Sequence, residues 1–83
     1  MIFSLNGKRA LVTGGSRGIG GATSRLLAQC GADVVVHYRS RSADAEAMAA
    51  ELRAMGRRAL TVAAELSDRV AVAAMFARIQ AEW

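Results

Sequence analysis

Glycine residues gather where an apolar run meets the start of a helical pattern. Gly14, Gly18 and Gly20 follow the apolar residues Leu11 and Val12. Glycine has no Cβ, so the main chain can bend sharply there and another molecule can approach it closely. A helix that starts after such a turn offers unpaired N–H groups and the positive end of its dipole. The turn therefore predicts a site for a phosphate or pyrophosphate, and the spacing Gly14-x-x-x-Gly18-x-Gly20 suits a dinucleotide.

Two other glycine-rich phosphate-binding motifs fit this stretch less well. A P-loop requires Gly-Lys followed by Ser or Thr, but Gly20 is followed by Gly21 and Ala22. The strict G-x-G-x-x-G fingerprint also fails, because Thr23 stands at its last position. A tight strand-to-helix turn that binds no ligand is the simpler alternative for the motif taken alone.

Length and composition restrict the class of protein. The 83 residues, 53% of them apolar, suffice for one small domain, which we place at residues 1–83. No apolar run approaches the roughly 20 residues that a membrane span needs, and Met1 to Leu5 lack the length and basic lead of a signal peptide. The single cysteine, Cys30, permits no internal disulfide, as in a reducing compartment. We therefore expect a cytoplasmic protein with no membrane partner, and we assign no metal ligands.

The net charge of +4 is spread unevenly. Residues 1–42 hold six basic residues and one acid, whereas residues 43–83 hold five basic and six acidic residues. A basic half can indicate nucleic-acid binding, but the chain shows no aromatic interleaving and no basic helix face. An anionic small ligand fits the clustering better, so we expect no nucleic-acid partner.

Strand and helix patterns alternate along the chain. Val34 to Val36 form a continuous β-branched run, which indicates burial on both faces of a parallel sheet. The βαβαβα order predicts an α/β fold, namely half of a doubly wound Rossmann fold with a three-stranded parallel sheet in the order 3-2-1. The predicted strands are residues 9–13, 34–38 and 58–63, and the predicted helices start near Ile19, Ser42 and Ser67.

Apolar stripes predict the buried faces of the helices. We expect the methionines of the helices and Phe76 to be core residues, Ser42 and Ser67 to be N-caps, and Asp68 to lie in the first turn of the last helix. The stripes are Ile19, Ala22, Leu26, Leu27 and Cys30, then Ala45, Met48, Ala49, Leu52 and Met55, then Val72, Met75, Phe76, Ile79 and Trp83.

The glycine turn also carries a family pattern. Thr13 to Gly20 read T-G-G-S-R-G-I-G and match the motif T-G-x-x-x-G-x-G without departure. With this motif and the βαβαβα order, the chain from Leu5 to Trp83 resembles the N-terminal part of a classical short-chain dehydrogenase/reductase, in the carrier-protein-reductase-like branch. The resemblance implies an oxidoreductase with a Rossmann fold whose first glycines line the pyrophosphate of a dinucleotide cofactor.

The resemblance also assigns individual residues to the cofactor. Ile19 would offer its backbone N–H to the pyrophosphate, and Ser16 and Arg17 occupy the turn where NADP-using members hold the 2′-phosphate. The family commonly holds the adenine with an aspartate and an aliphatic residue after the third strand, where this chain has Glu65 and Leu66. The longer glutamate would keep that role only with a shifted geometry. The candidate cofactor-binding residues are Gly14, Ser16, Arg17, Gly18, Ile19, Gly20, Tyr38, Arg39, Ser40, Glu65 and Leu66.

The end of the second strand bears on which nucleotide binds. An NAD site places a carboxylate there, about 20 residues past the glycines, to bond the ribose 2′-OH. Residues 37–41 read His-Tyr-Arg-Ser-Arg and contain no acid. Arg39 and Arg17 would instead clamp a 2′-phosphate, with Arg41 assisting, so NADP(H) is preferred over NAD(H). The alternative is that these arginines are solvated loop charges, and we expect His37 to be structural or solvent-facing.

The catalytic pair of the family has no counterpart in these residues. The family uses a tyrosine with a lysine four residues later, but Tyr38 is the only tyrosine, Ser42 stands four residues on, and Lys8 is the only lysine. We therefore expect the cofactor-binding segment of an NADP(H)-dependent oxidoreductase acting on carbonyl or alcohol substrates, with no catalytic residues and no activity alone. The alternative is a stand-alone or vestigial nucleotide-binding or assembly module without catalysis.

The strand order has a consequence for assembly. In a complete fold the first strand is central, whereas here one side of residues 10–13 would be an open apolar edge. Such an edge invites pairing with another chain. We therefore expect self-association through the first strand, as a two-fold dimer with one continuous sheet.

Overall fold

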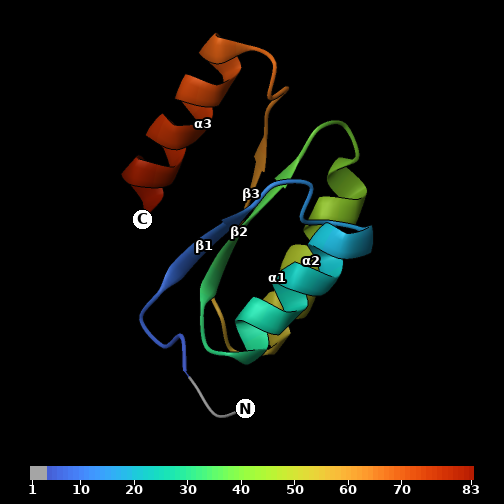
Figure 1. Cartoon of the computed structure of the whole chain (residues 1–83), viewed down its shortest axis with the longest axis vertical. Coiled ribbons are helices and arrows are strands. Elements are labelled where there is room, and N and C mark those ends of the chain that lie inside the picture. Colours follow the sequence, from blue (N-terminus) through green and yellow to red (C-terminus); the bar gives the residue numbers. More distant parts are fainter. Residues whose placement is uncertain (1–3) are drawn as a thin grey trace.

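Six elements alternate along the chain in the computed structural model, which describes residues 4–83 (Figure 1). They are β1 (Arg9–Val12), α1 (Gly18–Gln29), β2 (Asp33–Tyr38), α2 (Ser42–Ala54), β3 (Ala59–Ala63) and α3 (Arg69–Glu82). The predicted element order is confirmed, although the predicted first and third strands are one residue too long, at Thr13 and Arg58. Residues 1–3, part of the stretch assessed as a signal peptide, lie outside the described residues.

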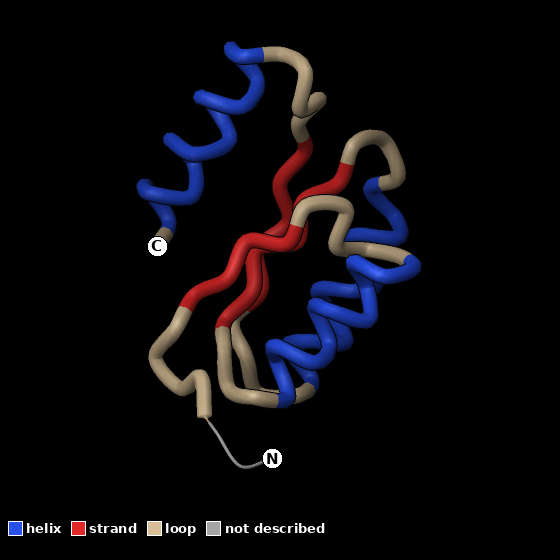
Figure 2. The backbone as a smooth tube through the Cα atoms, viewed as in Figure 1, coloured by secondary structure: helices blue, strands red, loops and turns tan. Residues whose placement is uncertain are grey.

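The three strands form one parallel sheet with β2 in the centre. They run through the middle of the molecule, between the helices (Figure 2). Val35 of β2 lies opposite Leu11 of β1 and opposite Leu60 of β3. The order β1-β2-β3 is the predicted order 3-2-1 and corresponds to half of a doubly wound fold. Within residues 4–83, β1 is an edge strand whose outer side pairs with no other strand.

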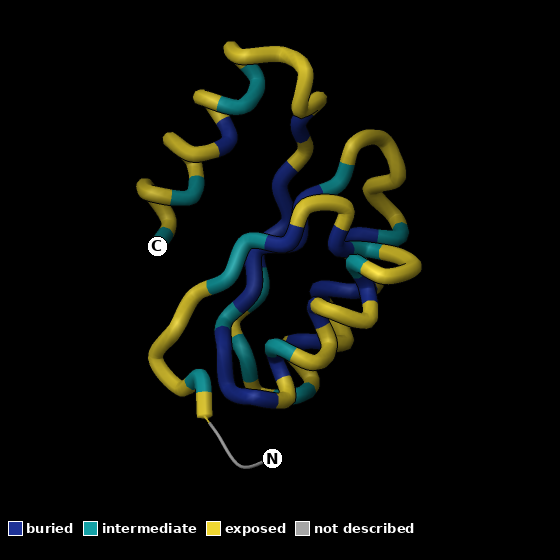
Figure 3. Tube along the Cα trace, in the orientation of Figure 1, coloured by how far each residue is buried: buried dark blue, intermediate teal, exposed yellow. Residues whose placement is uncertain are grey.

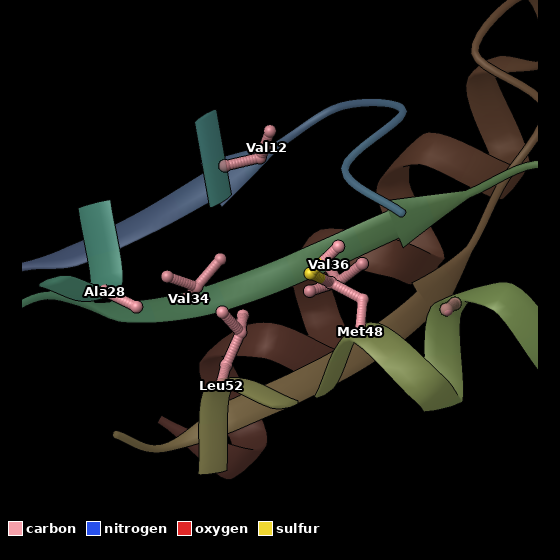
Figure 4. Packing of buried hydrophobic residues seen from close by; sticks show 7 residues of the cluster. Val12, Ala28, Val34, Val36, Met48 and Leu52 are labelled. Atoms are coloured by element: carbon pink, nitrogen blue, oxygen red, sulfur yellow. The ribbon is translucent and has the colours of Figure 1, made fainter. Parts of the chain in front are cut away.

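Helices cover both faces of the sheet. α1 and α2 lie on one face, and α3 lies on the other (Figure 1). Val34 and Val36 of β2 are fully buried in one cluster with Leu52 of α2 (Figure 4). Val35, between them, belongs to a second cluster with Met75 of α3. Helices cover both faces of β2, so every residue of the valine run is buried on one face or the other, which explains why the run is continuously apolar. Burial of each valine side chain stabilises the fold by about 1.5–3 kcal/mol.

α3 is the more exposed layer (Figure 3). Met75 is buried as predicted, but Phe76 is 48% exposed and Val70 is 78% exposed. The prediction that Phe76 is a core residue is therefore wrong. The physical reason is that α3 covers its face of the sheet alone, so residues on its flank have no second helix of the described chain to pack against.

Small residues make the buried face of α1. Gly21, Ser24 and Ala28 are buried, whereas Ile19 is 89% exposed and Leu26 is 50% exposed. The predicted stripe is wrong at these two larger side chains and at Ala22, which is also exposed. Small side chains let the helix approach the sheet closely, which turns the larger ones outward.

The helix starts differ from those predicted. The prediction of Ser67 as the cap of α3 is wrong, because Asp68 is the N-cap and its Oδ1 accepts from the N–H groups of Val70 (2.9 Å) and Ala71 (3.2 Å). Asp68 has extended backbone dihedrals one residue before the helix, which is the position that a capping carboxylate needs. The prediction for Ser42 is also wrong, because Ser42 is the first residue of α2 and no side chain caps this helix.

An ion pair joins the two helices that share a face. Arg25 of α1 donates to the carboxylate of Glu51 of α2. The hydrogen bond and the charge of Glu51 raise the pKa of the Arg25 guanidinium. Because both side chains are substantially exposed, the pair contributes little to stability.

Two leucines on these helices allow a matched test of the core. Leu52 is fully buried and Leu26 is 50% exposed. We expect Leu52→Ala to lower the free energy of unfolding by about 2–5 kcal/mol through the cavity that it leaves. Leu26→Ala, the control, should lower it by less than about 1 kcal/mol. Urea denaturation followed by circular dichroism measures both, and equal losses would contradict the described packing.

Candidate functional site

Three loops meet at one end of the sheet. They follow the strands at residues 13–17, 39–41 and 64–68. Because parallel strands share a direction, their carboxyl ends lie at the same edge, which is the upper end of the sheet in Figure 1. In doubly wound folds, ligands bind outside this edge.

The glycines of the first loop have distinct structural roles. Gly14 and Gly18 adopt φ values of +61° and +57°, which disfavour any residue with a Cβ. A Cβ at either would meet nothing within 4 Å, so both present bare main chain to open space. At Gly20, by contrast, a Cβ would lie 2.0 Å from the carbonyl oxygen of Gly14. Gly20 therefore allows α1 to pack directly against the turn.

The start of α1 is suited to an anion. Arg17 is the N-cap, with extended backbone dihedrals and no capping bond from its side chain. No acidic residue occupies the first turn of this helix. The first N–H groups and the positive end of the helix dipole therefore face the edge of the sheet without a neutralising carboxylate from α1.

A cavity of about 610 Å³ lies between the first two loops. Its volume is within the range typical of small-molecule sites. Three arginines give it a positive wall, as the uneven charge of the sequence indicates. The lining residues are Gly14, Ser16, Arg17, Gly18, Tyr38, Arg39, Ser40 and Arg41.

Most of the candidate residues meet at this cavity, and four do not line it. Gly20 lies behind the turn, and the side chain of Ile19 is turned to solvent. Glu65 and Leu66 lie on the third loop, where Leu66 is 48% exposed. Arg41, which the sequence suggests only as an assistant, is part of the wall.

Each arginine of the cavity has a carboxylate partner. Arg39 Nε lies 2.6 Å from Glu65 Oε2, which joins the second loop to the third. Arg17 Nε and Arg41 Nη1 both lie 3.9 Å from Asp44 Oδ2. Asp44 is not among the residues predicted for the site, although its position three residues after Arg41 at the start of α2 is a signal for a pair with Arg41. The arginines of the predicted clamp therefore all line the cavity, and each forms an ion pair with a carboxylate.

His37 is buried beneath the loops, with 4% of its surface exposed. Its Nδ1 lies 3.0 Å from the backbone nitrogen of Gly14, and its Nε2 lies 2.8 Å from the carbonyl oxygen of Ala64. Of the two roles expected for His37, the structural one agrees with this position and the solvent-facing one does not.

Residues 4–83 hold neither a cluster of metal ligands nor a membrane-spanning helix. No group of three or more histidine, cysteine, aspartate or glutamate residues there is arranged to hold a metal ion. No helix in the same range has both the length and the apolar character to cross a membrane.

Comparison with known proteins places the chain in a family. The family model described as short chain dehydrogenase matches residues 8–83. The chain belongs to the short-chain dehydrogenase family. It is 48% identical, over 66 residues, to an uncharacterised oxidoreductase of Mycobacterium tuberculosis, an alignment that covers 80% of this chain and 25% of that protein.

Solved structures of short-chain dehydrogenases share the fold. A short-chain dehydrogenase from Burkholderia cenocepacia in complex with NADP has 53% sequence identity and a TM-score of 0.79, over 82% of this chain and 28% of that one. The landomycin C-6 ketoreductase with bound NADP and rabelomycin has 44% identity and a TM-score of 0.83, over 89% of this chain and 30% of that one. The chain thus spans about a quarter to a third of the length of these relatives.

Two adjacent glycines test the close contact in the turn. Gly20→Ala should displace the carbonyl of Gly14, because its Cβ would lie 2.0 Å from that oxygen. Gly21→Ala is the control, since its Cβ would meet the flexible end of Met48 at 3.3 Å and the backbone of Ser16 at 3.4 Å, which is an ordinary van der Waals distance. Alanine adds about 1 kcal/mol of helix propensity at both positions. Of the two variants, we nevertheless expect only Gly20→Ala to lower the free energy of unfolding and to shift the amide NMR signals of residues 13–18. Similar stability and spectra for both variants would contradict the contact.

Proposed function

We propose that the chain is the NADP(H)-binding segment of an oxidoreductase that acts on carbonyl or alcohol substrates. The observation that carries this proposal is the cavity at the carboxyl edge of the sheet, where bare glycine main chain faces three arginines. Its size and charge suit a phosphorylated nucleotide. The NADP bound to two solved members of the family supports the choice of ligand.

The glycine turn and the start of α1 would hold the pyrophosphate. Gly14 and Gly18 leave space for it, since neither has a neighbour that a Cβ would meet. The backbone N–H of Ile19 lies in the first turn of the helix, where N–H groups lack intrahelical partners. Gly20 would act indirectly, by allowing the helix to start this close to the turn.

The 2′-phosphate would bind between Arg17 and Arg39, with Ser16 and Ser40 as hydroxyl donors on the same wall. The carboxylate partners of the two arginines belong to exposed ion pairs, which contribute little on their own. A phosphate with up to two negative charges makes stronger, paired hydrogen bonds to guanidinium groups. Binding would therefore replace these pairs, and this is the basis of our preference for NADP(H) over NAD(H).

The adenine would lie towards the second and third loops. Tyr38 lines the cavity at the end of β2, and the resemblance to the family suggests that Glu65 and Leu66 flank the ring. Glu65 bonds to Arg39 and accepts from Ser67 Oγ at 3.3 Å. Glu65 would thus turn from Arg39 to the adenine when the phosphate takes over the guanidinium.

The family's catalytic chemistry would lie outside residues 1–83. The hydride chemistry belongs to the nicotinamide of the bound cofactor, and the residues described here would bind and orient it. The one tyrosine, Tyr38, and the one lysine, Lys8, do not form the family's Tyr-x-x-x-Lys pair. We therefore propose binding without turnover for this chain, in the cytoplasm, where its buried free Cys30 would stay reduced.

A second candidate function is a binding or assembly module, and the open edge of β1 favours it. An apolar groove of about 320 Å³ runs beside this edge, between Leu11 and Phe76. Unpaired strand edges next to apolar surface are prone to pairing with another chain. We propose that two copies associate here with their β1 strands side by side.

Substitution of Arg39 tests the nucleotide assignment. Arg39→Asp exchanges an attraction for a repulsion at the 2′-phosphate, so the dissociation constant for NADPH should rise about 10- to 100-fold. The constant for NADH should change by less than about threefold, because NADH lacks this phosphate. Calorimetric titration measures both. Arg78→Asp makes the same charge change on α3, away from the cavity, and should alter neither affinity.

The outcomes separate the two candidate functions. NADPH binding without reduction of a model ketone supports the proposed binding segment. If Arg39→Asp lost the same affinity for NADPH as for NADH, the proposed contact of Arg39 with the 2′-phosphate would be contradicted. Failure of the unaltered chain to bind either nucleotide would overturn the cofactor proposal and leave the assembly module.

Light scattering tests the assembly proposal. We expect a dimer at high micromolar concentration, and a stable monomer there would exclude it. Phe76→Glu should shift the equilibrium to monomer by placing a charge in the groove beside β1. Val70→Glu adds the same charge to an exposed position on the same helix, outside the groove, and should leave the dimer intact.

A further inference from the structure

We propose that His37 is a positioning residue for the nucleotide site, acting through the backbone of Gly14. This inference rests on the proposed function, because the geometry that His37 controls is that of the predicted pyrophosphate loop. His37 is the only histidine of the chain and is 4% exposed. Its side chain reaches the cavity lining through a hydrogen bond to the main chain of Gly14.

The hydrogen bonds of His37 fix its tautomer. The Gly14 N–H can only donate, so Nδ1 must accept from it over 3.0 Å. The Ala64 carbonyl can only accept, so Nε2 must carry the proton and donate over 2.8 Å. One neutral imidazole with its proton on Nε2 satisfies both bonds. The ring therefore connects the loop after β1 to the loop after β3.

Backbone hydrogen bonds reinforce this connection. The carbonyl of His37 accepts from the Gly15 N–H at 3.0 Å, and the carbonyl of Tyr38 accepts from the Ala64 N–H at 3.2 Å. The side chain and main chain around His37 thus hold two consecutive glycine amides. The imidazole is the member of this set that a substitution can change without altering the backbone.

The Gly14 bond sets the direction of the turn. Gly14 is exposed and lines the cavity, yet its N–H points inward to Nδ1. Its carbonyl lies so close to Gly20 that a Cβ there would be 2.0 Å away. The imidazole thus bonds to the N–H of Gly14, while α1 packs against the carbonyl of the same residue. It follows that the Gly14 N–H is committed to the protein, and the N–H groups at the start of α1 are the ones left for the anion.

Two substitutions separate the two bonds of the ring. His37→Asn keeps an acceptor oxygen near the position of Nδ1 and loses the donor that reaches Ala64. His37→Gln can place an amide donor near the position of Nε2 and leaves the Gly14 N–H without its acceptor. Both variants lose one buried hydrogen bond, so they form a matched pair for stability.

Binding of NADPH is the deciding measurement. We expect His37→Asn to keep the dissociation constant within about threefold of the unaltered chain, and His37→Gln to raise it about tenfold or more. Thermal denaturation should give similar midpoints for the two variants. Equal affinities for the pair, or tighter binding by His37→Gln, would overturn the proposal and leave His37 as a packing residue.

Nitrogen NMR of the unaltered, unliganded chain provides an independent test. The sole histidine should show a protonated Nε2 and an unprotonated Nδ1 that is coupled through a hydrogen bond to the Gly14 amide. The opposite tautomer, or no coupling, would overturn the positioning role. If the chain binds no NADPH, the proposed function fails, whereas this spectrum and the effect of the two variants on the Gly14 to Gly18 amide shifts still decide the role of His37.

Discussion

The contact between the Cα of Gly20 and the carbonyl of Gly14 is the constraint on which the rest of the site depends. Only a residue without a Cβ can stand there, since an added Cβ would lie 2.0 Å from that oxygen. The close approach lets α1 begin at Gly18, only a few residues after β1 ends at Val12. A longer connection would move the positive end of the helix dipole away from the edge of the sheet, where the arginines lie.

The sheet supplies the rigid base for these loops. β2 is central and buried on both faces, so its end at Tyr38 is held by the packing of Val34, Val35 and Val36 against opposite helix layers. Residues that bind ligands are often found on loops that a rigid scaffold of this kind positions. The side chains that belong to different loops, such as Arg39 and Glu65, therefore meet because of core packing rather than through local sequence preference.

The fold could be predicted largely because its signals are local. Glycine spacing, the run of valines and the helical stripes give the element order, the parallel sheet and the edge position of β1. Exposure of Phe76 could not be predicted, because helical spacing shows which residues share a face but not how much of that face is covered. The predicted N-cap of α3, Ser67, was wrong by one residue, because Asp68 is the residue whose side chain caps the helix.

The sequence predicts which candidate residues lie near one another better than it predicts the contacts between them. Seven of the eleven candidate residues line the cavity, because motif spacing places the loops. Contacts between loops depend on tertiary geometry, so neither the pair of Asp44 with Arg17 nor the bond of His37 to Gly14 could be predicted from the sequence. Buried polar contacts of this kind require the distance between two chain segments, which composition and periodicity do not contain.

The separate placement of α3 has a consequence for the energy landscape of the chain. No residue of α3 lines the cavity, and the helix packs on the sheet through the cluster around Met75. Elements with few buried contacts open at lower free energy than the global unfolding reaction. Undocking of this C-terminal helix would leave both walls of the nucleotide cavity in place, so fast hydrogen exchange in α3 and slow exchange beneath the cavity are compatible within one native state.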